Sequence, residues 1–403
     1  MPLLRKYIAC LATCGLLLLC GGCSVISSLI PSDEKPLAAD PDVYRGEFKN
    51  NWLYGELDSK LQDCYGSLYT SLTDGFKEDT DVTISDKKSI GIEVVLPHSL
   101  TDESDYQKLH TAFYYDNPQF FYVHSTYGLE GYEKDGTAYY NKMVFTYTMD
   151  AATRKQARDQ LDSAVNKILR DRPNTPDEYE TELYLYEKLV SACTYDTTAA
   201  QAGYDRSPDA YTAYGALVNG TAVCEGYSRA LLLLLTKAGI RSTLIVGESI
   251  SSGEQHMWNL ASINGNTYHL DATWNDSNDL PRHNYFNVTT DQIKLSHRIS
   301  EGQLGIVNCI ATKDNYYHRN GLYVNTYSRQ SIAQIIATQI KAGDTLIEMA
   351  FAPDKYDNAL LFLKNRNAAE EHIEPYLVGS GYSLWEYVLY NEADEHILSI
   401  QKK

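Results

Sequence analysis

The feature that most limits how this chain can fold is a tight turn between two strand-like segments. Residues 256–263 and 266–273 meet at Asn264-Gly265, the strongest sequence signal for a two-residue type I′ hairpin. A two-residue loop fixes the register, and side chains two residues apart share a face. We therefore expect His256 and Asp271 to be diagonal neighbours on one face, about 7–8 Å apart along the backbone. A register shift of one residue would move Asp271 to the opposite face.

The second feature is a buried helix that is expected to begin at a cysteine. A glycine-bearing turn at Gly220 leads into Cys224, and the run Leu231–Leu235 is apolar on all sides, which indicates a helix inside a domain. The free N–H groups and the dipole at the start of such a helix favour negative charge. They would favour the thiolate of Cys224 and stabilise the oxyanion of an acyl intermediate. An inert buried cysteine is the alternative for this residue taken alone.

Cysteine, histidine and aspartate follow in an order that suits nucleophilic catalysis. Asp271 can bind one ring nitrogen of His256 and leave the other nitrogen to act as a base for Cys224. His269 lies on the same strand face as Asp271, and we expect it to be a structural residue of the sheet. Each residue alone has an ordinary structural explanation, but the three together predict a catalytic triad.

Four segments resemble the core of the transglutaminase-like superfamily, over roughly residues 180–290: Tyr214-Gly-Ala-Leu, Gly220-Thr-Ala-Val-Cys224-Glu-Gly-Tyr-Ser, His256-Met-Trp-Asn and Tyr268-His-Leu-Asp271-Ala-Thr-Trp-Asn-Asp276. The resemblance implies a papain-like cysteine-catalysis fold. It also implies that Cys224 is the nucleophile, His256 the general base and acid, and Asp271 the residue that orients His256.

The same resemblance suggests further parts of the site. Tyr211 and Tyr214 are candidates for a side-chain oxyanion donor, with core packing as the alternative. Trp258 and Trp274 are expected to form walls of the site rather than to take part in bonding.

The N-terminus has the pattern of a lipoprotein-type signal peptide. Arg5 and Lys6 precede an apolar run that is too short for a spanning helix, and small residues lead to Cys23. Residue Cys20 departs from the usual apolar position before such a site. We expect residues 1–22 to be the signal peptide and residues 23–45 a tether, with a lipid on Cys23 that holds the protein outside the membrane. An uncleaved N-terminal anchor is the alternative.

The remaining periodicities predict an α+β chain of three domains: an N-terminal α+β domain over 46–150, a transglutaminase-like catalytic domain over 151–300 and a small C-terminal α+β domain over 301–403. Helices are predicted over 102–115, 151–172, 177–193, 209–219, 224–239, 328–341 and 354–365. Strands are predicted over 90–96, 120–124, 139–149, 242–247, 256–263, 266–273, 322–326, 346–351, 383–389 and 395–400. Residues 196–209 read as a polar loop.

Charge and cysteine usage exclude several classes of function. A net charge of −18 and the lack of a basic stripe argue against nucleic-acid binding. Apart from the lipid site, the expected mature chain keeps Cys64, Cys193, Cys224 and Cys309, with no C-x-x-C motif, which fits neither a disulfide scaffold nor a zinc site. A Cys64–Cys193 bridge is one option, and separate buried thiols are the favoured one.

The combined features predict a cell-surface enzyme that hydrolyses peptide or amide bonds through a thioester, with a peptide or protein substrate and no cofactor. Cross-linking of proteins is the nearest alternative, and a non-catalytic surface binding or scaffold protein is the second. A metal enzyme built on His256, His269, Asp271 and His283 is disfavoured, because these residues show no tight ligand pair.

Overall fold

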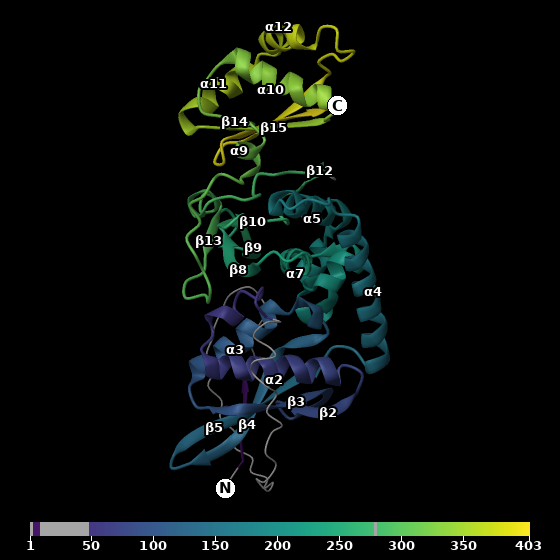
Figure 1. Ribbon diagram of the computed structural model, residues 1–403, viewed down its shortest axis with the longest axis vertical. Helices are drawn as coiled ribbons and strands as arrows, with labels where there is room; N and C mark the ends of the chain where they lie inside the picture. The colour runs from purple at the N-terminus through teal and green to yellow at the C-terminus, as the bar shows by residue number, and fades with distance from the viewer. Residues whose placement is uncertain (1–2, 9–47, 278–279) are drawn as a thin grey trace.

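The computed structural model describes residues 3–8, 48–277 and 280–403. Figure 1 shows three regions stacked along the longest axis, with the two chain ends in the outermost regions. The predicted lipid site Cys23 and tether lie outside the described residues. Within the described residues, no helix is both long and apolar enough to cross a membrane. The mixture of helices and strands confirms the α+β class.

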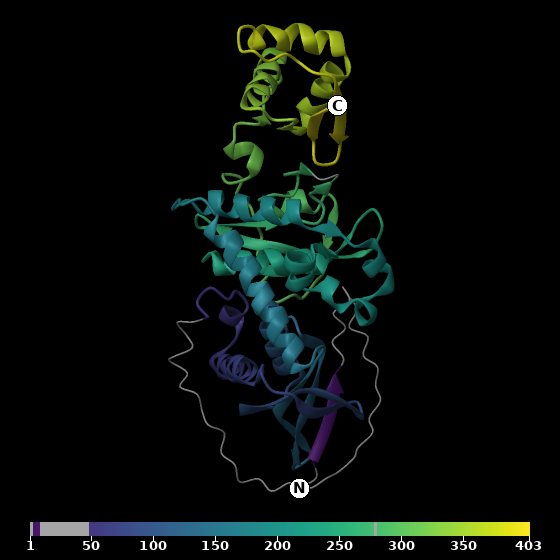
Figure 2. The same cartoon turned by 90° about the vertical axis from the view of Figure 1, so that its right-hand side faces the viewer.

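The first region is an antiparallel sheet with two helices on one side of it (Figure 2). Its strand order is β1-β4-β5-β3-β2, from β1 (Leu3–Ile8), β2 (Thr80–Ile84), β3 (Lys87–Leu100), β4 (Val123–Lys134) and β5 (Thr137–Tyr147). The helices are α2 (Ser59–Gly75) and α3 (Glu103–Asp116), with short 3-10 turns at Tyr54–Glu56 and Pro118–Phe120. The strand β1 comes from the predicted signal peptide and forms the edge next to β4.

The middle region packs a buried helix on a second antiparallel sheet. The helix is α7 (Cys224–Lys237), and the strand order is β10-β9-β8-β13. The strands are β8 (Ser242–Ser249), β9 (Gln255–Ile263), β10 (Asn266–Leu270) and β13 (His297–Ile299). Around them lie α4 (Ala151–Arg170), α5 (Glu178–Ala192), α6 (Thr197–Ala202) and α8 (Thr290–Ile293). Two short strand pairs complete it: β6 (Thr194–Tyr195) with β7 (Thr221–Ala222), and β11 (Asp276–Ser277) with β12 (Leu280–Pro281).

The C-terminal region has its own sheet, in the order β14-β15-β17-β16. The strands are β14 (Tyr323–Val324), β15 (Leu346–Phe351), β16 (Tyr387–Glu392) and β17 (Ile397–Lys402). Helices α10 (Arg329–Ala342), α11 (Pro353–Lys364) and α12 (Arg366–Leu377) pack on it, and the short helix α9 (Tyr316–Arg319) precedes it. Its hydrophobic core, from Val324 to Ile400, is separate from the core of the other two regions.

Helix caps explain why several boundaries could be predicted. The side chain of Asp177 accepts the N–H of Tyr179 at the start of α5, and Ser328 caps α10 in the same way. Both helices begin within one residue of the starts predicted at 177 and 328. The left-handed glycine Gly220 ends the helical turn before α7, as the Asn219-Gly220 pair indicated.

Three local predictions were wrong. Residues 196–209 are not a loop, because they contain α6 and a 3-10 turn at Tyr204–Arg206. The single helix expected over 209–219 is a 3-10 turn at Pro208–Tyr211 followed by a separate π turn at Gly215–Asn219. The strand expected at 120–124 begins only at Val123, because Pro118 starts a turn there. Short helical turns lack the periodic apolar stripe that reveals longer helices.

Candidate active site

The hairpin of β9 and β10 has the predicted register. Asn266 lies opposite Ile263, and Asn264 and Gly265 both have the positive φ of a type I′ turn. The paired ladder ends at Leu270, so the strand expected to reach residue 273 is shorter than predicted. Asp271 therefore lies just past the strand end, which leaves its carboxylate free to accept hydrogen bonds from a following turn.

The side chains of His256 and Asp271 meet directly. The His256 Nε2 atom lies 2.7 Å from Asp271 Oδ2, and both side chains are buried. The other carboxylate oxygen, Oδ1, accepts the backbone N–H groups of Thr273 and Trp274 at 2.9 and 3.2 Å. Aspartate often caps its own turn in this way, and here the turn fixes the carboxylate beside the imidazole.

Cys224 is the first residue of α7. It is 7% exposed, and no side chain caps the start of this helix. The first-turn N–H groups and the helix dipole therefore favour an anion at this point. The Ser228 hydroxyl is 2.8 Å from both the Cys224 carbonyl and the Met257 carbonyl, so it ties α7 to the strand that carries His256.

The electrostatics link all three predicted residues. Burial by itself would lower the pKa of His256, but attraction to Asp271 and hydrogen bonds with Asp271 and Cys224 raise that pKa to about 10. Burial works to raise the pKa of Asp271, but His256 and a hydrogen bond from His297 hold it below its usual range. Because Nε2 of His256 is bound to Asp271, its Nδ1 is the nitrogen available to Cys224.

A second histidine, His297 on β13, reaches the same carboxylate. Its Nε2 atom lies 3.1 Å from Asp271 Oδ2, and the side chain is fully buried. No motif or spacing in the sequence marks this residue, which stands 26 positions from Asp271. Only the pairing of β13 with β8 brings it to the site.

The predicted wall residues surround the imidazoles. Trp274 lies 5.2 Å from the His256 ring and 4.2 Å from the His297 ring, between ring centroids. Trp258 lies 6.0 Å from His256, but its Nε1 also donates to His269 Nδ1 at 3.0 Å, so it does take part in bonding. Burial lowers the pKa of His269 to about 3, and the neutral ring bonds Thr290. His269 is thus the structural sheet residue that was predicted.

The two tyrosines proposed as oxyanion donors bond elsewhere. The Tyr211 hydroxyl donates to the Ala199 carbonyl at 3.4 Å, and the Tyr214 hydroxyl donates to Gln160 at 2.8 Å. The uncapped N–H groups at the start of α7 remain the oxyanion donors that this geometry offers.

Among the described residues, the cysteines other than Cys224 are separate buried thiols. The Cys64–Cys193 bridge is not formed, and Cys309 is also free. Burial raises the pKa of Cys64 to about 12 and the pKa values of Cys193 and Cys309 to about 11. These three thiols are therefore poor nucleophiles at neutral pH.

Within the part of the chain that the structure describes, one group of side chains has the size of a metal site. The ligand atoms of His256, Asp271 and His297 lie within 4.8 Å of one another. Both Nε2 atoms already share hydrogen bonds with one carboxylate oxygen. His269 and His283, which were weighed as ligands from the sequence, are not in this group. A metal ion bound here would coordinate the Nε2 atom of His256, which is now hydrogen-bonded to Asp271.

A comparison with protein-family models matches the part of the chain that carries Cys224, His256 and Asp271. Residues 163–272 match the model of the transglutaminase-like superfamily, so this part of the chain is similar to a transglutaminase-like core. Comparison with curated protein sequences gave no match.

Three solved structures are similar over part of the chain. A transglutaminase is 13% identical with a TM-score of 0.27, covering 45% of this chain and 51% of its own. A candidate cysteine protease from Cytophaga hutchinsonii is 16% identical with a TM-score of 0.23, covering 36% and 56%. A candidate protease from Parabacteroides distasonis is 12% identical with a TM-score of 0.22, covering 34% and 29%. The chain thus spans between 29% and 56% of the length of these proteins.

Proposed function

We propose that this chain, through its transglutaminase-like core, is a cysteine-dependent acyl-transfer enzyme that hydrolyses peptide or amide bonds. One arrangement carries the proposal: Cys224 stands at an uncapped helix start, hydrogen-bonded to an imidazole whose other nitrogen binds Asp271. A buried thiol has no structural need for such partners, and the Sγ atoms of Cys64, Cys193 and Cys309 donate to backbone carbonyls instead.

The geometry supports a two-step reaction. The Cys224 thiolate, whose proton is already on the His256 imidazolium, attacks the carbonyl carbon. N–H groups of the first turn of α7 stabilise the resulting oxyanion. The His256 imidazolium then gives its proton to the leaving amine, and a thioester forms. His256 next takes a proton from water, which attacks the thioester and releases the acid.

The first region contributes to the surroundings of the nucleophile. Tyr115, near the end of α3, packs against the hydrophobic cluster that contains Cys224 and Met257. Arg229, one turn further along α7, bonds Glu225 and lies over the ring of Tyr114. An aromatic wall of this kind suits an extended peptide, which presents carbonyls and apolar side chains together.

The same proposal places the enzyme outside a membrane, anchored by a lipid on Cys23. The charged start, apolar run and small residues before Cys23 support this location. Mass spectrometry of the N-terminal peptide would detect the lipid, and Cys23→Ala should release the protein from membranes. Cleavage at another residue would contradict the lipid anchor on Cys23 but would leave the proposed reaction unaffected.

The chemistry is tested by trapping the acyl-enzyme. Wild-type protein is incubated with a peptide library and analysed by mass spectrometry, in parallel with Cys224→Ala and with the control Cys309→Ala. We expect a mass adduct on Cys224 in wild type and in the control, and none in Cys224→Ala. A fluorescent primary amine added to the reaction separates hydrolysis from cross-linking, because only cross-linking incorporates the amine.

Thiol labelling tests the alternative of a binding protein. Iodoacetamide should alkylate Cys224 much faster than Cys64, Cys193 or Cys309 at neutral pH, because only Cys224 faces an imidazolium. Equal rates at all four thiols would favour a non-catalytic surface protein.

A further inference from the structure

His297 is not one of the three triad residues, but its side chain contacts the Asp271 carboxylate of the triad. Its Nε2 atom is 3.1 Å from Asp271 Oδ2, the oxygen that also bonds His256 at 2.7 Å. An ionised carboxylate can only accept hydrogen bonds, so His297 must donate to it. Asp271 therefore receives four donors: two imidazoles on Oδ2 and two backbone N–H groups on Oδ1.

The four donors act differently on the position of the carboxylate. The backbone donors of Thr273 and Trp274 hold Oδ1 against the turn. His256 must exchange protons during the proposed reaction, so its bond to Oδ2 changes in strength. His297 is the donor on Oδ2 that stays outside the proton transfer. It can keep this oxygen in place throughout the cycle.

The ring of His297 is itself held from several sides. Its Nδ1 lies 2.9 Å from Ser296 Oγ, and the rings of Trp274 and Tyr285 pack on it at 4.2 and 5.3 Å between centroids. Titratable groups that face it are His256, Asp271 and Tyr285, and His297 adds to the effect of burial in lowering the pKa of His269.

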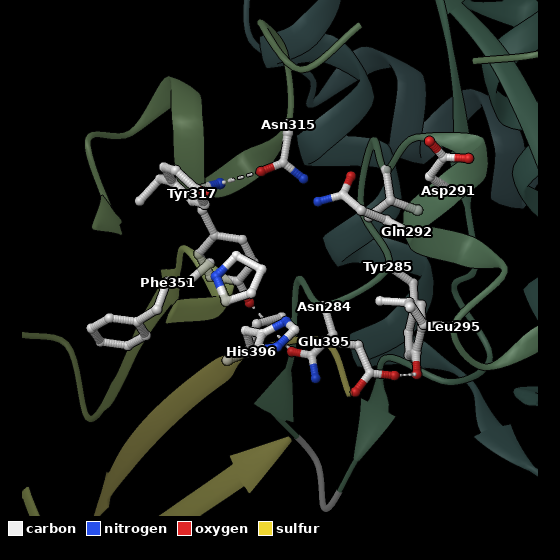
Figure 3. A pocket seen from close by; sticks show the side chains of 15 residues that line it. Asn284, Tyr285, Asp291, Gln292, Leu295, Asn315, Tyr317, Phe351, Glu395 and His396 are labelled. Atoms are coloured by element: carbon white, nitrogen blue, oxygen red, sulfur yellow. Dashed lines mark hydrogen bonds between the residues drawn. The ribbon is translucent and has the colours of Figure 1, made fainter. Parts of the chain in front are cut away.

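The C-terminal region reaches this histidine through Tyr285. The Tyr285 hydroxyl donates to Glu395 Oε1 at 2.7 Å, a bond visible in Figure 3. Glu395 belongs to the turn between β16 and β17, and both residues line a cavity of about 280 Å³ between the middle and C-terminal regions. Neither Cys224 nor the other triad residues line this cavity, so it is not the reaction site.

We propose that His297 is a positioning residue, which holds the Asp271 carboxylate in place for His256, and that the C-terminal region holds His297 through Tyr285 and Glu395. This inference rests on the proposed function, because it assigns a second histidine to the same triad. It also gives the C-terminal region a role in catalysis, which neither the sequence nor the core alone suggests.

The test measures the rate of Cys224 alkylation by iodoacetamide as a function of pH, which needs no substrate. His297→Leu removes the donor, and His297→Gln keeps an N–H group near the position of Nε2. We expect His297→Leu to slow alkylation at acidic pH by about 10- to 100-fold, the value of one hydrogen bond to a charged group. The acid limb of its profile should move to higher pH, and His297→Gln should restore much of the rate.

The contribution of the C-terminal region is tested in the same assay. Tyr285→Phe removes the donor of this hydrogen bond and Glu395→Ala removes its acceptor, so each should shift the acid limb in the same direction by a smaller amount. Their effects should not add in the double variant. Asp394→Asn, which removes a charge from the same turn, is the matched control and should leave the profile unchanged.

The outcomes separate this inference from the proposed function. If wild-type Cys224 reacts no faster than Cys309, the proposed function fails. If wild-type Cys224 reacts fast but His297→Leu and His297→Gln both keep the wild-type profile, only the role of His297 fails. If His297→Leu does not fold, the alkylation profile of Tyr285→Phe is compared with those of His297→Gln and Asp394→Asn. A Tyr285→Phe profile equal to that of Asp394→Asn would contradict the role of His297. Alkylation or turnover that requires added Zn²⁺ after treatment with EDTA would overturn the role of His297 in favour of a metal site.

Discussion

At the scale of single residues, Asp271 holds the site together. Its side chain accepts four hydrogen bonds, and its backbone carbonyl accepts the hydroxyl of Tyr186 at 3.1 Å. It has no exposed surface, so its charge is compensated wholly by these donors and by His256. The orientation of the His256 ring, and hence the nitrogen that faces Cys224, depends on this one carboxylate.

We expect Asp271→Asn to lower kcat/KM by about 10³-fold or more, because an amide can no longer stabilise the imidazolium or select the correct tautomer. Peptide hydrolysis and Cys224 alkylation would both measure the loss. Asp276→Asn, which changes a carboxylate that accepts the Tyr227 hydroxyl, is the matched control and should retain activity. Wild-type rates in Asp271→Asn would remove Asp271 from the mechanism.

At the scale of elements, the site depends on how closely β8 approaches its neighbours. Gly247 lies opposite His256 on β9 and opposite Ile299 on β13. A side chain there would meet the Arg298 carbonyl oxygen at 2.2 Å and the Trp258 ring at 2.6 Å. The glycine therefore lets Trp258 cover the strand and lets β13 pair close enough to deliver His297.

The substitution Gly247→Ala should destabilise the protein by about 1–3 kcal/mol, because backbone and a buried ring must both move. It should also slow Cys224 alkylation, since β13 carries His297. Gly55→Ala is the control, because a Cβ at that position meets nothing within 4 Å. Urea unfolding of both variants gives the two free energies, and a neutral Gly247→Ala would refute the close-packing argument.

At the scale of the whole molecule, the three regions are not equally independent. Hydrophobic residues of the first and middle regions form one continuous core, which includes Leu61, Phe145, Leu189 and Tyr268. The Trp52 indole also donates to the Gly305 carbonyl at 2.9 Å. The C-terminal core is separate and meets the middle region through polar contacts, among them His283 with Glu348 at 2.7 Å.

Truncation should reveal this difference. We expect residues 46–321 to unfold cooperatively as one unit, because both parts of the shared core are present. Residues 151–321 should expose a large apolar surface and aggregate. Circular dichroism melting and size-exclusion chromatography would check both fragments. A soluble, cooperatively folded 151–321 fragment would contradict the shared core.

The contact between the middle and C-terminal regions should respond to pH. Burial alone would lower the pKa of His283, but Glu348 and Glu187 raise it to about 9. A group whose pKa is raised by folding stabilises the folded state below its unfolded pKa, and this stability is lost as pH rises through the folded value. The stability that His283 contributes should therefore be lost between about pH 6.5 and pH 9.

We expect the melting temperature of wild type to fall across this window more steeply than that of Glu348→Gln, which has lost the main charged partner. Glu386→Gln, on an exposed carboxylate of the same region, is the control and should follow wild type. Parallel curves for all three proteins would show that His283 does not titrate with folding.

The sequence by itself predicted much of this molecule because its signals are local. The Asn264-Gly265 turn determined the hairpin register, and the helices predicted over 177–193 and 328–341 begin beside the capping residues Asp177 and Ser328. These features act over a few residues, so they can be read without knowing the fold. The expected meeting of His256 and Asp271 follows from the same local geometry.

Only the tertiary structure decided what surrounds that pair. The position of His297 depends on a three-residue strand pairing with β8, and no local pattern predicts such a pairing. Tyr285 reaches Glu395 over 110 positions, and the shared core joins regions that look like separate domains in sequence. Long-range contacts of this kind come from packing, which depends on the shapes of many side chains at once and has no signature in any one segment.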